Sequence, residues 1–333
     1  MLARPGAAFW AVRWLLRDAS RTPGLFFRCV ALMPRMFDIL RECERDPPTI
    51  LHLFWGHYPA VLAGLVKRRL PAIHLSMSLG AYDLVYRFGA SIAAANAADS
   101  LWTHAQCNVE PIRLMGIRNP RLEVLRRGID LSQVPHPPYN KIAGRIVAVA
   151  RLVRDKGVDD VIRAFAEASK RLPHLQLVII GEGPDRRRLE HLAEDLGLLE
   201  AIEFVGAAPH SRVYRELVQA DAFMLLSRSA SERLPNAVKE AMACGCLCIT
   251  TRTPGIEELR AHPDNPLVVD PGQWAEAAQM LIDVLTRHER YVEARERGRA
   301  FVLREFDSKT LAARRMSVWS AAKMISGAVE CAE

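Results

Sequence analysis

Short apolar runs alternate with amphipathic helical patterns over the second half of the chain, and this alternation constrains the fold more than any other feature. The predicted strands are 145–149, 175–180, 202–205, 222–226, 247–251 and 266–269. The predicted helices between them are 158–171, 185–196, 212–220 and 235–243. Such alternation predicts an α/β unit with one doubly wound parallel sheet of about six strands, in which ligands bind beyond the carboxyl ends of the strands.

A less regular alternation precedes this unit and predicts a second, incomplete sheet. The predicted strands are 50–54, 72–76, 100–103 and 121–125, and the predicted helices are 59–69, 91–98 and 111–115. The proline-rich stretch Pro135–Pro138 is the predicted linker. The resulting domains are 49–138 and 139–310, followed by a C-terminal helix or tail over 311–333. Residues 274–328 are predicted to be mostly helical.

Residues 1–48 form a predicted amphipathic helical segment with helices over 9–17 and 24–43. The second helix contains Pro34, which strains a helix interior. The first 41 residues hold seven arginines against two aspartates, interleaved with aromatic side chains. Two interpretations stay open, because such helices pack on a domain or lie on an anionic membrane surface.

Composition bounds the class of protein. The chain has 333 residues, of which 50% are hydrophobic and 25% charged, as in globular proteins of about two domains. There is no apolar run long enough for a spanning helix and no clear signal peptide. The seven scattered cysteines indicate a reducing, cytoplasmic location and no zinc site. The net charge of +7 favours an anionic partner, and no nucleic-acid-binding motif is present.

Cations, glycine turns and a helix N-terminus follow neighbouring strands of the predicted second sheet. Arg151 and Lys156 follow its first strand, Gly181–Gly183 its second and Gly206 its third. The helix after the fourth strand begins near Pro235-Asn236. Because the carboxyl ends of parallel strands share one edge, these groups converge on a site suited to a diphosphate. The glycine turns are expected to let the ligand approach the backbone.

Two glutamates flank the start of the same predicted helix. Glu232 precedes the helix and is expected to point into the site. Glu240 lies inside it between Ala237, Val238, Ala241 and Met242. A buried carboxylate needs a partner, and two ribose hydroxyls would supply one.

These residues resemble family 4 of the retaining glycosyltransferases, of the exopolysaccharide and lipopolysaccharide type. The resemblance rests on Arg151–Gly157, Gly181–Pro184, Glu232–Gly245 and Thr253–Leu259, in this order and spacing. It is strong over 145–272 and weaker before. It implies a GT-B fold, in which two Rossmann-like domains face a cleft, with a truncated N-terminal domain here. Roughly the first two or three strands of that domain are missing from the pattern. An upstream gene start, a minimised domain, or an inactive relative or subunit that needs a partner would each explain this.

The resemblance also implies roles for individual residues. Arg151 and Lys156 would hold the donor diphosphate, Glu240 would bind the ribose and Glu232 would lie near the donor sugar. The backbone of Val205 and Gly206 would frame the base. The loop with Gly255 and Glu258 would bind the diphosphate or the sugar from the other side. No metal or other cofactor is implied, and the donor would be a UDP- or GDP-linked sugar.

The acceptor side departs from the family pattern. Members usually carry a His-Gly pair before an aspartate, whereas this chain has Leu79 at the histidine position and one extra residue before Asp83. His57, His74 or His104 could substitute in space, and His57 is the first choice.

Two functions remain open. The first is transfer of a hexose, with retention of configuration, to a polysaccharide or lipid-linked acceptor at the inner face of the cytoplasmic membrane. The alternative is a non-catalytic nucleotide-sugar-binding partner of another glycosyltransferase. A Rossmann oxidoreductase is disfavoured because no Gly-x-Gly-x-x-Gly follows a predicted strand.

Overall fold

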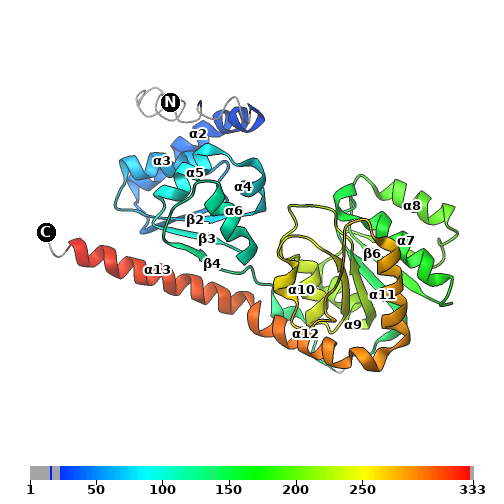
Figure 1. The fold of residues 1–333 in the computed structure, drawn as a ribbon. Coiled ribbons are helices and arrows are strands. Elements are labelled where there is room, and N and C mark those ends of the chain that lie inside the picture. Colours follow the sequence, from blue (N-terminus) through cyan, green and yellow to red (C-terminus); the bar gives the residue numbers. More distant parts are fainter. Residues whose placement is uncertain (1–15, 17–22, 138, 331–333) are drawn as a thin grey trace. The chain divides into compact units, whose positions relative to one another are not determined.

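The structure, a computed structural model, describes residue 16 and residues 23–137 and 139–330. The chain divides into two compact units, which Figure 1 shows and which are described separately below. The first unit comprises residues 1–126 together with 311–333, and the second comprises residues 127–310. The predicted helix 9–17 lies outside the described residues except for Leu16.

The first unit is built on a parallel sheet of four strands in the order β1-β2-β3-β4. The strands are β1 (Ile50–Phe54), β2 (His74–Leu79), β3 (Ser100–Thr103) and β4 (Leu122–Val124). The helices are α2 (Pro23–Arg45), α3 (Ala60–Arg69), α4 (Ala81–Tyr86), α5 (Gly89–Ala97), α6 (Val109–Leu114) and α13 (Ser308–Glu330). The sequence-predicted strands and helices of this region are present, and α4 is an addition that was not predicted.

One face of this sheet carries the apolar core of the first unit. Leu75, Met77 and Leu79 alternate along β2 and pack with the buried side of α3 and α5. Helix α2 joins this core through Cys29, Met33, Leu40 and Cys43 and continues through Pro34. The packed interpretation therefore holds for α2, whose opposite side leaves Phe27 68% exposed.

The opposite face of the sheet is polar and is covered by α13. His52 lies between the hydroxyls of Ser76 and Ser78, at 3.0 and 3.2 Å from its two ring nitrogens. Trp319 of α13 donates a 3.1 Å hydrogen bond to Ser76, and its ring lies 5.4 Å from that of Trp102. Burial, together with the nearby Arg315 guanidinium, lowers the pKa of His52 to about 4. The C-terminal helix is thus an integral layer of the first unit.

The second unit is built on a parallel sheet of six strands in the order β10-β9-β8-β5-β6-β7. The strands are β5 (Ile142–Val149), β6 (Gln176–Ile180), β7 (Ile202–Gly206), β8 (Ala220–Leu225), β9 (Leu247–Thr251) and β10 (Leu267–Val269). The helices are α7 (Val158–Ser169), α8 (Arg186–Asp195), α9 (His210–Gln219), α10 (Asn236–Ala243), α11 (Trp274–Thr286) and α12 (Val292–Glu305). The doubly wound sheet predicted from the sequence is confirmed.

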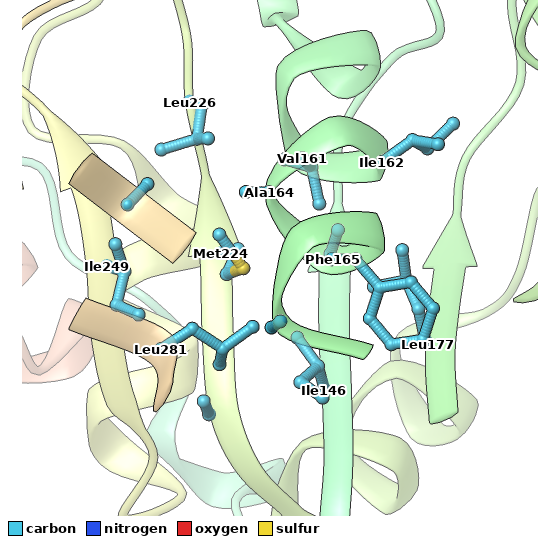
Figure 2. Close-up of a cluster of buried hydrophobic side chains, with 14 of the residues drawn as sticks. Ile146, Val161, Ile162, Ala164, Phe165, Leu177, Met224, Leu226, Ile249 and Leu281 are labelled. Atoms are coloured by element: carbon cyan, nitrogen blue, oxygen red, sulfur yellow. The ribbon is translucent and has the colours of Figure 1, made fainter. Parts of the chain in front are cut away.

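Helices cover both faces of this second sheet. Side chains of α7 and α11 pack against β5, β6, β8 and β9 in one apolar cluster, part of which Figure 2 shows. Phe165 of α7 is fully buried there beside Ile146 and Leu177. Helices α9 and α12 each pack on α10 on the other side. Burying both faces explains why these strands read as continuous apolar runs in the sequence.

The two units differ from the predicted domain ranges at their junctions. Residues 127–137 group with the second unit because Ile129 forms a parallel β-bridge with Asp307. In this bridge Ile129 N–H donates to Phe306 O at 2.9 Å, and Ser308 N–H donates to Ile129 O at 3.0 Å. Residues after 310 group with the first unit rather than forming a separate tail. No helix among the described residues is long and apolar enough to cross a membrane.

Candidate functional site

The order of strands in the second unit puts its topological switch point between β5 and β8, where open α/β sheets form a ligand-binding crevice. From β5 the chain winds outward through β6 to β7 and then returns to the other side of β5 as β8. Helices that leave the two central strands in opposite directions cannot fill the space beyond their carboxyl ends. The segments Ala150–Gly157 and Leu226–Pro235 follow these two strands, so they border this crevice.

Close backbone packing fixes these two segments against each other. Gly157 adopts φ of 61°, and a Cβ atom there would lie 1.8 Å from the carbonyl oxygen of Leu226. Ser227 Oγ and Arg228 N–H both donate to Asp155 O, at 3.0 and 2.8 Å. The short turn that carries Lys156 is therefore held at the end of β8.

Lys156 and Glu232 meet at this crevice. The Lys156 ammonium contacts the Glu232 carboxylate directly, and the two side chains are 20% and 13% exposed. The same segment includes Leu234, which is buried although its φ is 46°. A bulky residue with positive φ is rare and strained, and such strain concentrates at functional sites. Arg151 also follows β5 and is exposed, without a resolved contact to the pair.

Helix α10 starts beside this pair. Pro235 is its N-cap residue and Asn236 its first residue, so the free N–H groups and the positive end of the helix dipole lie directly after the Glu232 segment. The sequence prediction placed the start of this helix one residue earlier, at Pro235. An anion between Lys156 and the start of α10 would meet positive charge from both sides.

Glu240 lies on the second turn of α10 and is 7% exposed. Its Oε1 atom is 3.9 Å from His210 Nδ1 at the start of α9. Burial raises the pKa of Glu240 although His210 and Lys239 act in the opposite direction. The carboxylate is therefore desolvated without a close ion pair, which leaves it able to accept hydrogen bonds from a ligand.

The glycine turn after β6 packs closely against the backbone that follows β5. A Cβ atom at Gly181 would lie 1.8 Å from Ala150 O, and one at Gly183 would lie 2.2 Å from Leu152 O. Leu152 N–H donates to Glu182 O, and Asp185 N–H donates to Leu152 O. The missing side chains of Gly181 and Gly183 thus admit neighbouring backbone, and the predicted contact of this turn with a ligand stays a prediction.

The end of β7 is bordered by an ion pair. Gly206 has φ of 82°, and a Cβ atom there would lie 2.7 Å from the Glu182 carboxylate. Arg186 donates to that carboxylate at 2.6 Å and to Phe204 O at 3.1 Å. Val205 is half-buried beside them. The backbone of Val205 and Gly206 lies at the same sheet edge as the Lys156 turn, two strands away.

The loop after β9 brings a buried hydroxyl to this edge. Gly255 has φ of 88° and begins the short 3-10 helix Ile256–Leu259, which contains Glu258. Thr253 is 5% exposed, and among the described residues its Oγ1 has no hydrogen-bond partner. A buried hydroxyl without a partner is costly, and a bound ligand would satisfy it.

His57 belongs to the first unit. It follows β1, and its Nδ1 lies 3.3 Å from the carboxylate of Asp83. Asp83 is 1% exposed and also accepts from Gly56 N–H at 2.9 Å and Gly80 N–H at 2.8 Å. Of the three histidines considered for the acceptor side, His57 is thus the one shown beside this aspartate, whereas His74 lies 3.2 Å from Ser100 Oγ.

Lys239 is a notable residue that the sequence interpretation missed. It is fully buried, donates a 2.7 Å hydrogen bond to Arg127 O and lies 5.1 Å above the Phe306 ring. Burial lowers its pKa to about 7. Its position directly before Glu240 in an otherwise apolar helix stretch was the signal that could have drawn attention to it.

Comparisons with known proteins bear on the same part of the chain. Residues 139–301 match the family model "Glycosyl transferases group 1". One component of the phosphatidylinositol N-acetylglucosaminyltransferase of Arabidopsis thaliana is 36% identical over 143 residues, which are 42% of this chain and 31% of that protein. The putative colanic acid biosynthesis glycosyltransferase WcaL of Salmonella typhimurium is 30% identical over 208 residues, 60% of this chain and 51% of that protein.

A solved structure covers more of the chain. Anabaena HepE in complex with UDP has a TM-score of 0.76 and 17% sequence identity, over 86% of this chain and 82% of that one. The likeness shows the fold, and the chain spans only about a third to a half of the two curated relatives named above. The family match and the two parallel sheets support the resemblance inferred from the motifs: the chain has the GT-B fold, and its residues 139–301 match the group 1 glycosyltransferases.

Proposed function

We propose that this protein transfers a hexose from a UDP- or GDP-linked sugar to a saccharide or lipid-linked acceptor, with retention of configuration. One observation carries the proposal: Lys156 and Glu232 meet at the β5–β8 crevice, directly before the N-terminus of α10. A cation and a helix N-terminus that face the same space suit a diphosphate. The neighbouring carboxylate suits the hydroxyls of a sugar.

In the proposed reaction the acceptor hydroxyl oxygen forms a bond to the anomeric carbon, and the bond from that carbon to the diphosphate breaks. The proton of the hydroxyl passes to the leaving phosphate on the same face, so configuration is kept. Lys156, Arg151 and the start of α10 stabilise the charge that grows on the leaving group. Glu240 accepts hydrogen bonds from the ribose, and the proposal requires neither a metal nor another cofactor.

The names of similar proteins support the substrate classes. HepE was crystallised with UDP, and WcaL carries a name that refers to colanic acid biosynthesis. The Arabidopsis relative is named for phosphatidylinositol, which is a lipid. We extend the proposal to an acceptor at the cytoplasmic face of a membrane, because the first 41 residues hold seven arginines against two aspartates.

Thermal unfolding with a panel of nucleotide sugars tests the donor. UDP-glucose, UDP-galactose, UDP-N-acetylglucosamine and GDP-mannose are compared with NAD. A ligand that binds only the native state at about 100 times its Kd adds about 2.7 kcal/mol of stability. We expect one sugar nucleotide to raise the midpoint and NAD to leave it unchanged.

Transfer is then measured with the stabilising donor and Glu232→Gln. The exposed pair Arg212–Glu203 supplies a matched control, Glu203→Gln, in the same unit. We expect Glu232→Gln to lose transfer while keeping its unfolding midpoint, and Glu203→Gln to keep both. A panel in which no sugar nucleotide shifts the midpoint would contradict the proposal. Donor binding without transfer or hydrolysis would limit the function to binding.

A further inference from the structure

The first unit contains a pocket walled by aromatic side chains. Its volume is about 410 Å³, within the range of small-molecule sites. Its lining includes Arg28, Trp55, His57, Tyr58, Tyr82 and Tyr86. These residues come from the start of α2, from the segment after β1 and from α4 after β2. The pocket thus lies at the carboxyl-end edge of the first sheet.

The aromatic rings of this pocket are arranged as platforms. Tyr82 and Tyr86 lie one turn apart on α4, with ring centroids 6.0 Å apart and planes 11° from parallel. Trp55 stacks on His57 at 5.7 Å. Trp55, Tyr82 and Tyr86 are 39%, 48% and 51% exposed, an unusual degree for three large rings that share one pocket. Rings that are apolar on their face and polar at the rim match a sugar, whose C–H face is apolar and whose hydroxyls are polar.

The backbone holds Trp55 in a strained conformation. Its φ is 73°, in the left-handed region that a bulky side chain rarely adopts. Trp55 N–H donates to Ser78 O at 3.0 Å, and Gly56 N–H donates to the Asp83 carboxylate at 2.9 Å. A Cβ atom at Gly80 would lie 3.0 Å from the Trp55 indole nitrogen. These contacts hold Trp55 in its unfavourable backbone conformation, in which the indole lines the pocket.

Two polar groups at the pocket are fixed in position. Asp83 is buried and holds Nδ1 of His57, which leaves Nε2 of the ring as the atom for a ligand hydroxyl. Arg28 donates to the Tyr58 hydroxyl at 3.1 Å, and its side chain is exposed. Cys29 on α2 is 1% exposed, and its thiol donates a hydrogen bond to the His57 carbonyl oxygen. One histidine acceptor and one fixed guanidinium favour a saccharide that bears an anionic group.

We infer that this pocket binds an anionic saccharide, whose ring stacks on Trp55 and on the tyrosines of α4 while Arg28 pairs with its negative group. Asp83 acts as a positioning residue that orients His57 toward a hydroxyl of the sugar. The inference rests on the proposed function only in naming this saccharide as the acceptor of the transfer. Binding itself is a property of the first unit and is testable without a donor.

Saturation-transfer NMR on the full chain tests the pocket, with glucuronic acid as the anionic probe and methyl glucoside as the neutral one. We expect both sugars to receive saturation, and glucuronic acid to bind a few times more tightly. Tyr86→Ala and Trp55→Ala should weaken both sugars about tenfold, since a stacking surface is lost. Arg28→Gln should remove the preference for the acid and leave methyl glucoside unaffected.

Two matched controls share the helices of the pocket without lining it. Phe27→Ala removes a 68% exposed ring beside Arg28, and Val85→Ala removes a 56% exposed side chain from α4. We expect both controls to bind like the wild type. In ¹⁵N spectra of the histidines, glucuronic acid should move the Nε2 signal of His57 and not that of the exposed His191, a readout that a purely structural role would not give.

Unchanged binding in Trp55→Ala and Tyr86→Ala, or no saturation of either sugar, would overturn the inference. A failure of the proposed function looks different. In that case no sugar nucleotide raises the unfolding midpoint, while glucuronic acid binding still depends on Trp55 and Tyr86.

Discussion

Replacing Glu240 with glutamine should move stability and nucleotide binding in opposite directions. The carboxylate is 7% exposed, and His210 Nδ1 is 3.9 Å away, too far for a strong ion pair. Glutamine keeps the shape and removes the desolvated charge. We expect the ligand-free variant to gain on the order of 1 kcal/mol, or about 2–4 °C in the midpoint for a unit of this size.

The gain should depend on pH with a definite sign. Burial raises the pKa of Glu240, so the native state binds more protons than the unfolded state between the usual glutamate value of about 4.3 and the raised value. Wild-type stability therefore falls as pH rises through that window, and the glutamine variant lacks this fall. The stability difference should be present at neutral pH and vanish below about pH 4.

Nucleotide binding should weaken in the same variant. If the carboxylate accepts hydrogen bonds from two ribose hydroxyls, its neutral replacement loses about 2 kcal/mol, which is about thirtyfold in Kd. Calorimetric titration with UDP and GDP measures this loss, and urea unfolding measures the gain. Glu194→Gln on α8, with a side chain 63% exposed, is the control that should change neither. A variant that is less stable and binds nucleotide as before would refute the reasoning.

Further substitutions and conditions probe the rest of the second unit. Lys156→Met should weaken nucleotide-sugar binding about thirtyfold by calorimetry, because a cation at the diphosphate is lost, whereas the exposed Lys170→Met should have no effect. Above about pH 7, the pKa of Lys239, the unfolded wild type binds a proton that the buried amine does not, so wild-type stability should rise with pH and Lys239→Met should lack this rise. Urea unfolding at several pH values should show the stability difference between wild type and variant growing by up to about 1.4 kcal/mol per pH unit. A stability difference that stays constant with pH would contradict this assignment. Gly157→Ala should lower stability by more than about 3 kcal/mol, because the new methyl group meets Leu226 O. Gly197→Ala, at a similar positive φ with open space around it, should lower stability by only about 1–2 kcal/mol. Equal losses of stability in thermal unfolding would show that backbone strain rather than the clash dominates. Transfer should survive EDTA, since the proposed charge stabilisation comes from protein groups, and a loss that Mg²⁺ or Mn²⁺ restores would require a metal.

The second sheet was predictable because its strands are buried on both faces. β9 lies where the run Leu247–Thr251 predicted it, and the carboxyl ends of β5 and β8 bring Lys156 and Glu232 together as the motif spacing required. The prediction ended β2 at Ser76, three residues before its observed end at Leu79, because the polar residues Ser76 and Ser78 interrupt the apolar pattern on the side that α13 covers. The spacing of apolar residues indicates which side of a strand is buried. It cannot reveal that a polar side is covered by a segment far away in the sequence.

The features missed from the sequence depend on contacts between distant residues. Helix α4 has only six residues and is held by the Asp83 carboxylate, which no local pattern reveals. The glycines at 181 and 183 resemble a ligand-binding turn in sequence, yet their role follows from the backbone of Ala150 and Leu152 lying against them. His57 could be proposed only as one of three histidines, because its pairing with Asp83 spans 26 residues and requires two strands to align.

The placement of α13 has a consequence for biosynthesis. The polar side of the first sheet is closed by Trp319, although its strands are complete by Val124. During translation the ribosome must therefore add the whole second unit before His52 and Trp102 can be covered. The second unit is contiguous in the chain, so all of its residues are synthesised before the part of α13 that covers this face of the first sheet.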